Sequence, residues 1–266
     1  MKKKLLITII VLNINLLYSQ KIFKDYGERE TVETLDIELL KLVSKNSEFL
    51  FENIYLDKSF SKKYNESITF FSIRYITKKF ELENYYTTTF LFVNNSGEIL
   101  GELKNNDLSY SNVEAGQPYP TKILTNNIPI NETINGIGII TEFSSPSRIT
   151  LYSEELFSII TFDNNSIKVV LENYPIRKTQ GDSNGWGNYK IEIIESLIFI
   201  EKEKSYNFNN LKVVKNFTFE DNLEKDSSKN IEGFNKKKEF KEIEVIKYDR
   251  NKYNFKKIEY KFLKGY

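Results

Sequence analysis

Apolar and polar residues alternate along the chain from Gly136 to Glu220. The period of two is clear in residues 137–143 and again on both sides of the turn 163–166, whose Asp, Asn and Ser residues favour tight reversals. It resumes in residues 189–193 and 211–219. Several short strands at regular spacing indicate an antiparallel, hairpin-rich sheet, so we expect 136–220 to be a central β region built as a sandwich, a barrel or a small propeller.

A different pattern opens the chain. Leu35, Leu39, Leu42 and Val43 make one apolar stripe, which predicts a helix within residues 31–46, and Thr34 is placed to cap it. Alternation in 68–76 and in 85–103, around the turn 94–97, predicts a strand and a hairpin. Residues 20–104 are therefore expected to hold the one helix of a mainly β protein, together with strands.

Three further segments complete the predicted organisation. Residues 105–135 are polar and contain three prolines, which indicates an irregular connection. Residues 221–238 are charged and poor in apolar side chains, which is typical of a linker or loop. Residues 239–266 regain alternation around the turn 249–252 and are expected to form a C-terminal hairpin.

The longest interruption of the central alternation is the polar stretch 177–188, RKTQGDSNGWGN. It contains three of the eleven glycines and the only tryptophan of the chain. Its large ring either folds back as a plug over an open sheet end or contacts a sugar or protein partner, and we expect the plug. The candidate binding residues are Arg177, Asp182, Asn184, Trp186 and Asn188.

The first 19 residues have the composition of a signal peptide. Lys2–Lys4 precede an apolar run from Leu5 to Tyr18, and Ser19 supplies a small residue for cleavage. The run is short for a membrane span, so we expect no transmembrane helix after cleavage and a periplasmic or secreted protein; an uncleaved anchor is the alternative. The chain has no cysteine, so its stability cannot come from disulfides.

Composition excludes several kinds of chemistry. The chain has no histidine and no cysteine, which removes the usual catalytic bases, the usual thiol nucleophiles and the usual zinc, haem-thiolate and iron–sulfur ligands. Asp182 and Asn184 begin like a calcium loop, but the later ligand positions are missing. The net charge is only +1, which gives no electrostatic reason to expect a nucleic-acid partner. We therefore predict no metal and no cofactor.

The sequence contains residues for two catalytic patterns. Ser59 and Lys62 have the S-x-x-K spacing of the serine β-lactamases, but the companion motifs stand in the wrong order, so we attribute the match to composition. Paired carboxylates could hydrolyse a glycan. The acids available for such a pair are Glu142, Glu154, Glu155, Glu172 and Asp182. Nothing in their spacing selects two of them.

The sequence favours a non-catalytic binding or inhibitory module of the bacterial envelope, with a protein or a glycan as its partner. The alternatives are a carboxylate-dependent glycan hydrolase and a structural envelope component.

Overall fold

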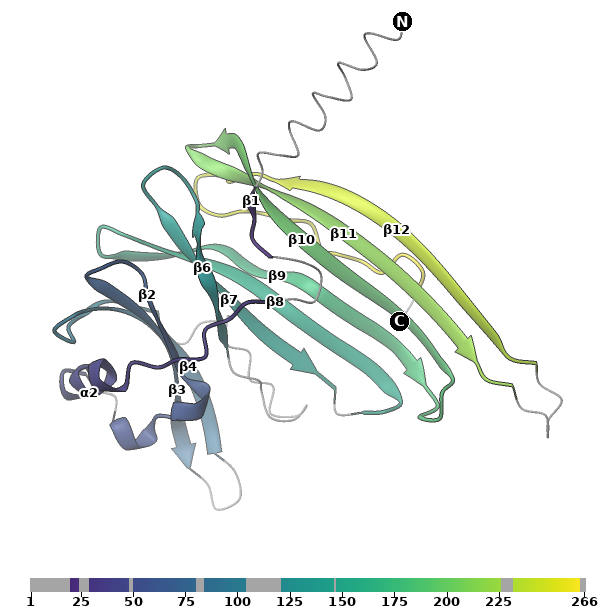
Figure 1. The fold of residues 1–266 in the computed structure, drawn as a ribbon, viewed down its shortest axis with the longest axis horizontal. Helices are drawn as coiled ribbons and strands as arrows, with labels where there is room; N and C mark the ends of the chain where they lie inside the picture. The colour runs from purple at the N-terminus through teal and green to yellow at the C-terminus, as the bar shows by residue number, and fades with distance from the viewer. Residues whose placement is uncertain are drawn as a thin grey trace, which may run out of the picture.

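A computed structural model of the chain describes residues 20–23, 29–47, 50–79, 84–103, 121–145, 147–225 and 232–263. These residues form an eight-stranded sheet, a four-stranded sheet and one α-helix (Figure 1). The fold is mainly β and antiparallel with an N-terminal helix, as predicted. The predicted signal peptide and residues 105–120 of the predicted irregular connection 105–135 lie outside the described residues.

The large sheet is built from long strands that follow one another along the chain. Its order is β12-β11-β10-β9-β8-β7-β6, so each of these strands pairs with its neighbour in sequence, and β1 pairs with β10. The strands are β1 (Gln20–Lys21), β6 (Lys122–Pro129), β7 (Asn135–Ser144), β8 (Thr150–Asp163), β9 (Ser166–Ser183), β10 (Tyr189–Ser205), β11 (Phe208–Leu223) and β12 (Phe234–Ile246). The turn between β8 and β9 places Asn164 and Asn165 at positive φ, which confirms the predicted hairpin.

The small sheet has the order β2-β3-β4-β5. Its strands are β2 (Phe60–Lys63), β3 (Ile68–Lys79), β4 (Asn84–Asn94) and β5 (Ile99–Leu103). The helix α2 spans Ile37–Lys45, and short 3₁₀ turns follow at Phe51–Asn53 and Leu56–Lys58. Asp36, rather than Thr34, caps the helix, because its carboxylate accepts the backbone N–H of Leu39.

The small sheet is buried on both faces. Leu40 and Val43 of the helix pack on one face, against a cluster that includes Phe71 and Leu91. On the other face, Phe92 of β4 stacks on Phe162 of the large sheet with ring centroids 4.5 Å apart. The helix, the small sheet and one end of the large sheet thus form three successive layers.

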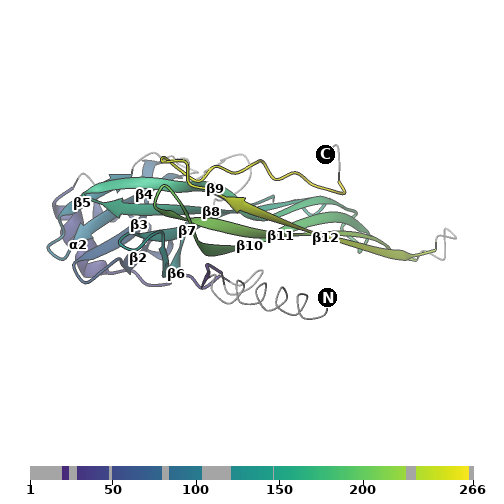
Figure 2. The same cartoon turned by 90° about the horizontal axis from the view of Figure 1, so that it is seen from above.

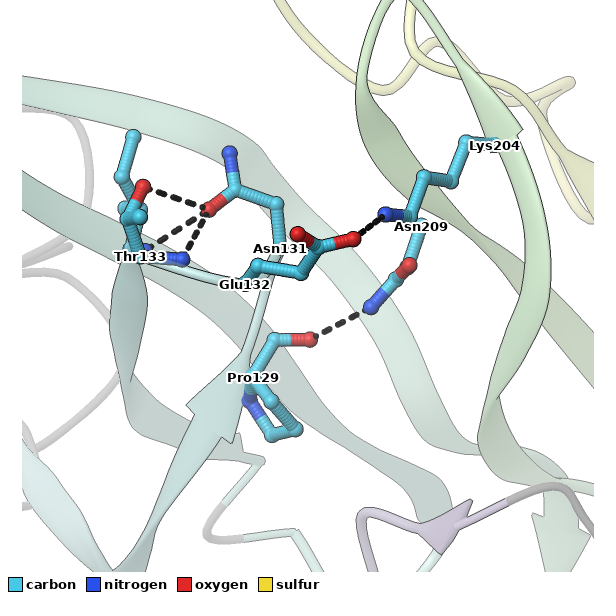
Figure 3. Close-up of polar contacts among 7 residues, drawn as sticks. Pro129, Asn131, Glu132, Thr133, Lys204 and Asn209 are labelled. Atoms are coloured by element: carbon cyan, nitrogen blue, oxygen red, sulfur yellow. Dashed lines mark hydrogen bonds and ion pairs between the residues drawn. The ribbon is translucent and has the colours of Figure 1, made fainter.

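The large sheet curls into a half-barrel, and polar contacts join its distant parts (Figure 3). Asn209, at the start of β11, donates its backbone N–H to the carbonyl oxygen of Ile130 at 2.8 Å and its side-chain amide to that of Pro129 at 3.1 Å. Lys204 contacts the Glu132 carboxylate at 2.7 Å. The turn between β6 and β7 is thereby fastened to the hairpin of β10 and β11.

The C-terminal segment departs from the sequence prediction. After β12 the chain turns at Asp249–Lys252 and makes only an isolated bridge between Tyr248 and Tyr253. It then runs along one face of the large sheet without forming a strand (Figure 2). Its alternating apolar residues, such as Ile258 and Phe262, pack onto that face, so the predicted hairpin at 239–266 is wrong.

Three predicted irregular segments are shorter than expected. Strand β6 occupies residues 122–129, β11 continues to Leu223, and β12 begins at Phe234. The third is the polar stretch 177–188, whose first seven residues belong to β9. All seven pair with β10, and the first six also pair with β8. Their backbone groups are satisfied by two neighbouring strands, so polar side chains on half-exposed faces do not break the strand.

Candidate functional site

The turn between β9 and β10 forms one end of the large sheet and carries Trp186. Only residues 184–188 separate the two strands. The Trp186 side chain is 85% exposed, so the expectation that it plugs the sheet end is wrong. The ring projects from the turn into solvent.

The turn is held by its own side chains. The side-chain oxygen of Asn184 accepts the backbone N–H of Trp186 at 2.8 Å and that of Asn188 at 3.1 Å. Ser183 accepts the N–H of Gly185 at 3.0 Å. Gly185 and Gly187 both have positive φ, +75° and +102°, a conformation that glycine adopts at little cost.

The neighbouring strand fixes the turn from outside. Asn222 on β11 donates its side-chain amide to the carbonyl oxygen of Gly187 at 2.8 Å. The backbone N–H of Glu224 donates to the side chain of Asn188 at 2.7 Å. Both bonds come from the hairpin of β11 and β12. The backbone that carries Trp186 is therefore held by side chains of its own turn and by this neighbouring hairpin.

An open hollow of about 250 Å³ lies at this end of the sheet. Its walls combine carboxylate, amide, hydroxyl and ammonium groups with two apolar side chains, Leu223 and Phe234. The polar lining residues are Asp182, Ser183, Asn184, Asn188, Tyr189, Lys190, Asp221 and Asn222. The hollow is shallow and its accessible lining is mainly apolar, so it offers a contact surface beside the turn.

The structure brings together four of the five predicted site residues. Asp182, Asn184 and Asn188 line the hollow, and Trp186 stands on the same turn. Arg177 lies five residues before Asp182 on β9, a separation of roughly 17 Å along a strand. Sequence reasoning missed the contribution of β11 and β12, because only the sheet register brings Phe234 to the end of β9.

Arg177 instead belongs to a row of charged side chains across the middle of the sheet. Glu142, Glu155, Arg177 and Glu195 are successive cross-strand partners on β7, β8, β9 and β10. The guanidinium of Arg177 lies 3.8 Å from Glu155 and 3.7 Å from Glu195. Arg29 approaches Glu155 at 3.7 Å from the N-terminal segment.

Burial changes the electrostatics of this row. Desolvation raises the pKa of Glu155 above its ordinary value, and the neighbouring Glu142 raises it further, while Arg29, Arg177 and Lys122 act in the opposite direction. Lys122 also forms an ion pair with Glu142 at 2.5 Å. The pair Glu142 and Glu155 is thus the one combination of the candidate acids that the register places face to face.

The other candidate groups have structural partners. Ser59 donates to the carbonyl oxygen of Tyr55 and accepts the backbone N–H of Arg74. Lys62 donates to the carbonyl oxygen of Leu124 at 3.0 Å and so ties β2 to β6, and burial lowers its pKa to about 8. Glu154 forms an ion pair with Lys178 at 3.1 Å, and Glu172 pairs with Lys252 at 3.4 Å.

In the part of the chain that the structure describes, no group of three or more acidic side chains is arranged to hold a metal ion. No helix among the same residues is long and apolar enough to cross a membrane. The chain matches no protein family, no curated protein and no solved structure.

Proposed function

We propose that this protein is an exported, non-catalytic binding module of the bacterial envelope, and that the turn 184–188 with its adjacent hollow is its binding site. The observation that carries the proposal is the exposure of Trp186 on a braced turn. A tryptophan left in water forgoes the stabilisation that burial would give, whereas an exposed and rigidly held ring can anchor a partner at small entropic cost.

A glycan is the ligand class that fits this site best. A sugar ring offers an apolar face of C–H groups and an edge of hydroxyl groups. Trp186 supplies a flat apolar surface, and Phe234 and Leu223 add apolar area in the hollow. Asp182 and Asn188 supply acceptors and donors beside it.

Export is the second element of the proposal. Lys2–Lys4 and the apolar run that follows direct the chain to the periplasm or the medium. Mass spectrometry of protein purified from the native host should find a mature terminus near Gln20. An intact Met1 terminus would contradict export by cleavage.

The binding site is tested by titrating the protein with soluble envelope polysaccharide fragments while tryptophan fluorescence is recorded. Trp186 is the only tryptophan, so a ligand that covers it should change the emission directly. Trp186→Ala should weaken binding measured by calorimetry by about 2 kcal/mol, as expected for an interface anchor.

Tyr206→Ala is the matched control. Tyr206 is also an exposed aromatic residue on a turn, at 59% exposure, but it lies between β10 and β11 at the other end of β10. Its removal should leave glycan affinity unchanged. Equal losses in both variants, or no loss in Trp186→Ala, would place the site elsewhere.

Glycan hydrolysis is the second candidate, favoured by one observation. Glu155 has a raised pKa, as a general acid requires, and it lies opposite a second carboxyl group, that of Glu142. Both are also paired with cations, which equally suits a structural role. Release of reducing ends by the wild type, abolished in Glu155→Gln, would support hydrolysis; turnover without that dependence would exclude this pair.

A further inference from the structure

Strand β12 ends the large sheet and has a free outer edge. It pairs with β11 from Leu211↔Ile246 to Leu223↔Phe234, and no other described strand lies on its opposite side (Figure 1). Most of its 13 residues are exposed. A long exposed edge offers a row of unpaired N–H and C=O groups to another strand.

The strand also exposes apolar side chains in unusual number. Phe240 is 45% exposed, Ile243 63% and Val245 43%. Lysines on an edge strand normally discourage pairing, and β12 carries Lys236, Lys237, Lys238 and Lys241. That protection fails against a partner strand that places acids opposite the lysines.

A second copy of β12 is such a partner. The N-terminal half of the strand, after Asn235, is basic, and the C-terminal half contains Glu242 and Glu244. If two copies pair antiparallel with Phe240 opposite Phe240, every charged pair in the ladder joins opposite signs. The pairs are Glu239 with Lys241, Lys238 with Glu242 and Lys236 with Glu244, each made twice by the twofold axis.

The same register forms two kinds of apolar pair, while Val245 lies opposite Asn235. Phe234 then faces Ile246, and the Phe240 rings form a cross-strand aromatic pair at the axis. Lys237 falls beside Ile243, where its aliphatic stem can cover the exposed side chain. Residues on one face of the sheet meet residues on the same face, so the two large sheets continue as one.

Neighbouring registers lose this match. If Lys241 is at the centre, the two copies of Lys241 lie opposite each other. If Glu239 is at the centre, the two copies of Glu239 lie opposite each other, and Lys237 lies opposite Lys241. Like charges directly opposite each other oppose pairing. The register is therefore specified by the sequence of β12 itself.

Contacts inside one copy do not block the arrangement. Lys215 holds Glu242 at 2.6 Å and Glu244 at 2.9 Å from the β11 side. Lys261 also holds Glu242, at 3.0 Å. A carboxylate has about four acceptor positions, so Glu244 can take a second ammonium group from a partner strand and Glu242 a third. Glu239 pairs with Lys237 only at the exposed surface.

From the free edge and its self-complementary charges, we infer that the protein forms a twofold dimer through antiparallel pairing of β12 with the β12 of a second copy, in the register that centres Phe240. The dimer joins the two eight-stranded sheets and removes the exposed edge of each. The turn 184–188 takes no part in this interface, whereas Phe234 lines the adjacent hollow and also lies in the ladder, opposite Ile246 of the second copy.

Cysteine cross-linking tests the register, because the chain has no cysteine of its own. Directly opposite residues in an antiparallel pair have Cα atoms roughly 4.5–5.5 Å apart, within reach of a disulfide. Full-length Phe240→Cys should therefore form a covalent dimer on mild oxidation. Ile243→Cys is the control, since its copies are six positions apart along the ladder, roughly 20 Å, and it should remain uncross-linked.

A charge exchange tests the interface without altering a buried residue. Light scattering should find the wild type as a dimer whose dissociation rises with salt. Glu239→Lys or Lys241→Glu alone should raise the dimer dissociation constant about tenfold by creating like-charge pairs. The double variant should restore wild-type association. A monomeric wild type, equal cross-linking of both cysteine variants, or a double variant weaker than either single one would overturn the inference.

Discussion

The carboxylate of Glu192 on β10 accepts the backbone N–H of Phe262 at 2.8 Å. The same carboxylate accepts the N–H groups of Lys261 at 2.7 Å and Leu263 at 2.8 Å. Glu192 is fully buried, and its charge is balanced by three converging amide dipoles. One strand residue therefore fixes the end of a segment that is not itself part of the sheet.

Replacement of this carboxylate should release the C-terminal segment. We expect Glu192→Gln to lower the free energy of unfolding by about 1–3 kcal/mol, because one acceptor oxygen is lost and an amide donor is buried against N–H groups. Hydrogen exchange should show faster exchange at residues 261–263. Glu203→Gln, at an exposed position of the same strand, should change neither quantity. Unchanged exchange in Glu192→Gln would mean that apolar packing alone holds the segment.

Alternation was enough to predict the mainly β fold because it records which face of each strand is buried. It could not predict the path of residues 254–263. Ile258 and Phe262 alternate as a strand would, but they are buried by lying across a sheet face, and the Glu192 side chain accepts the backbone N–H groups of residues 261–263. A period of two shows that one side is buried and does not show what covers it.

The glycine turn should respond unequally to alanine at its two glycines. A Cβ on Gly187 would lie 2.1 Å from the Glu224 carboxylate, whereas one on Gly185 would meet nothing within 4 Å. Both residues have positive φ, so Gly185→Ala should cost about 1 kcal/mol of stability from backbone strain alone. Gly187→Ala should cost about 1–3 kcal/mol, because the Glu224 contact must also shift. Chemical denaturation measures the difference, and equal costs would show that the Glu224 side chain moves away freely.

The candidate site was only partly accessible from the sequence. The clustering of Asp182, Asn184 and Asn188 around Trp186 follows from their being neighbours along the chain. The separation of Arg177 from these residues does not follow from the sequence. The polar composition of 177–188 suggested a single loop, whereas β9 continues to Ser183. Gly181 permits this: a Cβ there would collide with the backbone of β10, so the glycine serves close strand pairing rather than a loop.

Trp186 should contribute little to folding. Its side chain is 85% exposed, so Trp186→Ala should change the free energy of unfolding by no more than about 0.5 kcal/mol. The folded wild type should emit at a long, water-like wavelength and be readily quenched by iodide. A loss of several kcal/mol, or emission typical of a buried indole, would restore the plug and remove the basis of the proposed binding site.

The charged row gives a dependence of stability on pH. Burial raises the pKa of Glu155 above its ordinary value of 4.5, so the folded state binds more protons than the unfolded state just above that pH. The contribution of Glu155 to the free energy of unfolding is then fully present below about pH 4.5. It is lost as the pH rises through the pKa of Glu155 in the folded state. Glu155→Gln removes the titration, so the stability of the wild type relative to this variant should fall as the pH rises from 4.5. Denaturation at several pH values measures that difference, and Glu66→Gln, on an exposed turn, serves as the control variant. A relative stability that instead rises with pH would mean that Arg29 and Arg177 outweigh burial, and that Glu155 is ionised in the fold as an ordinary ion-pair partner.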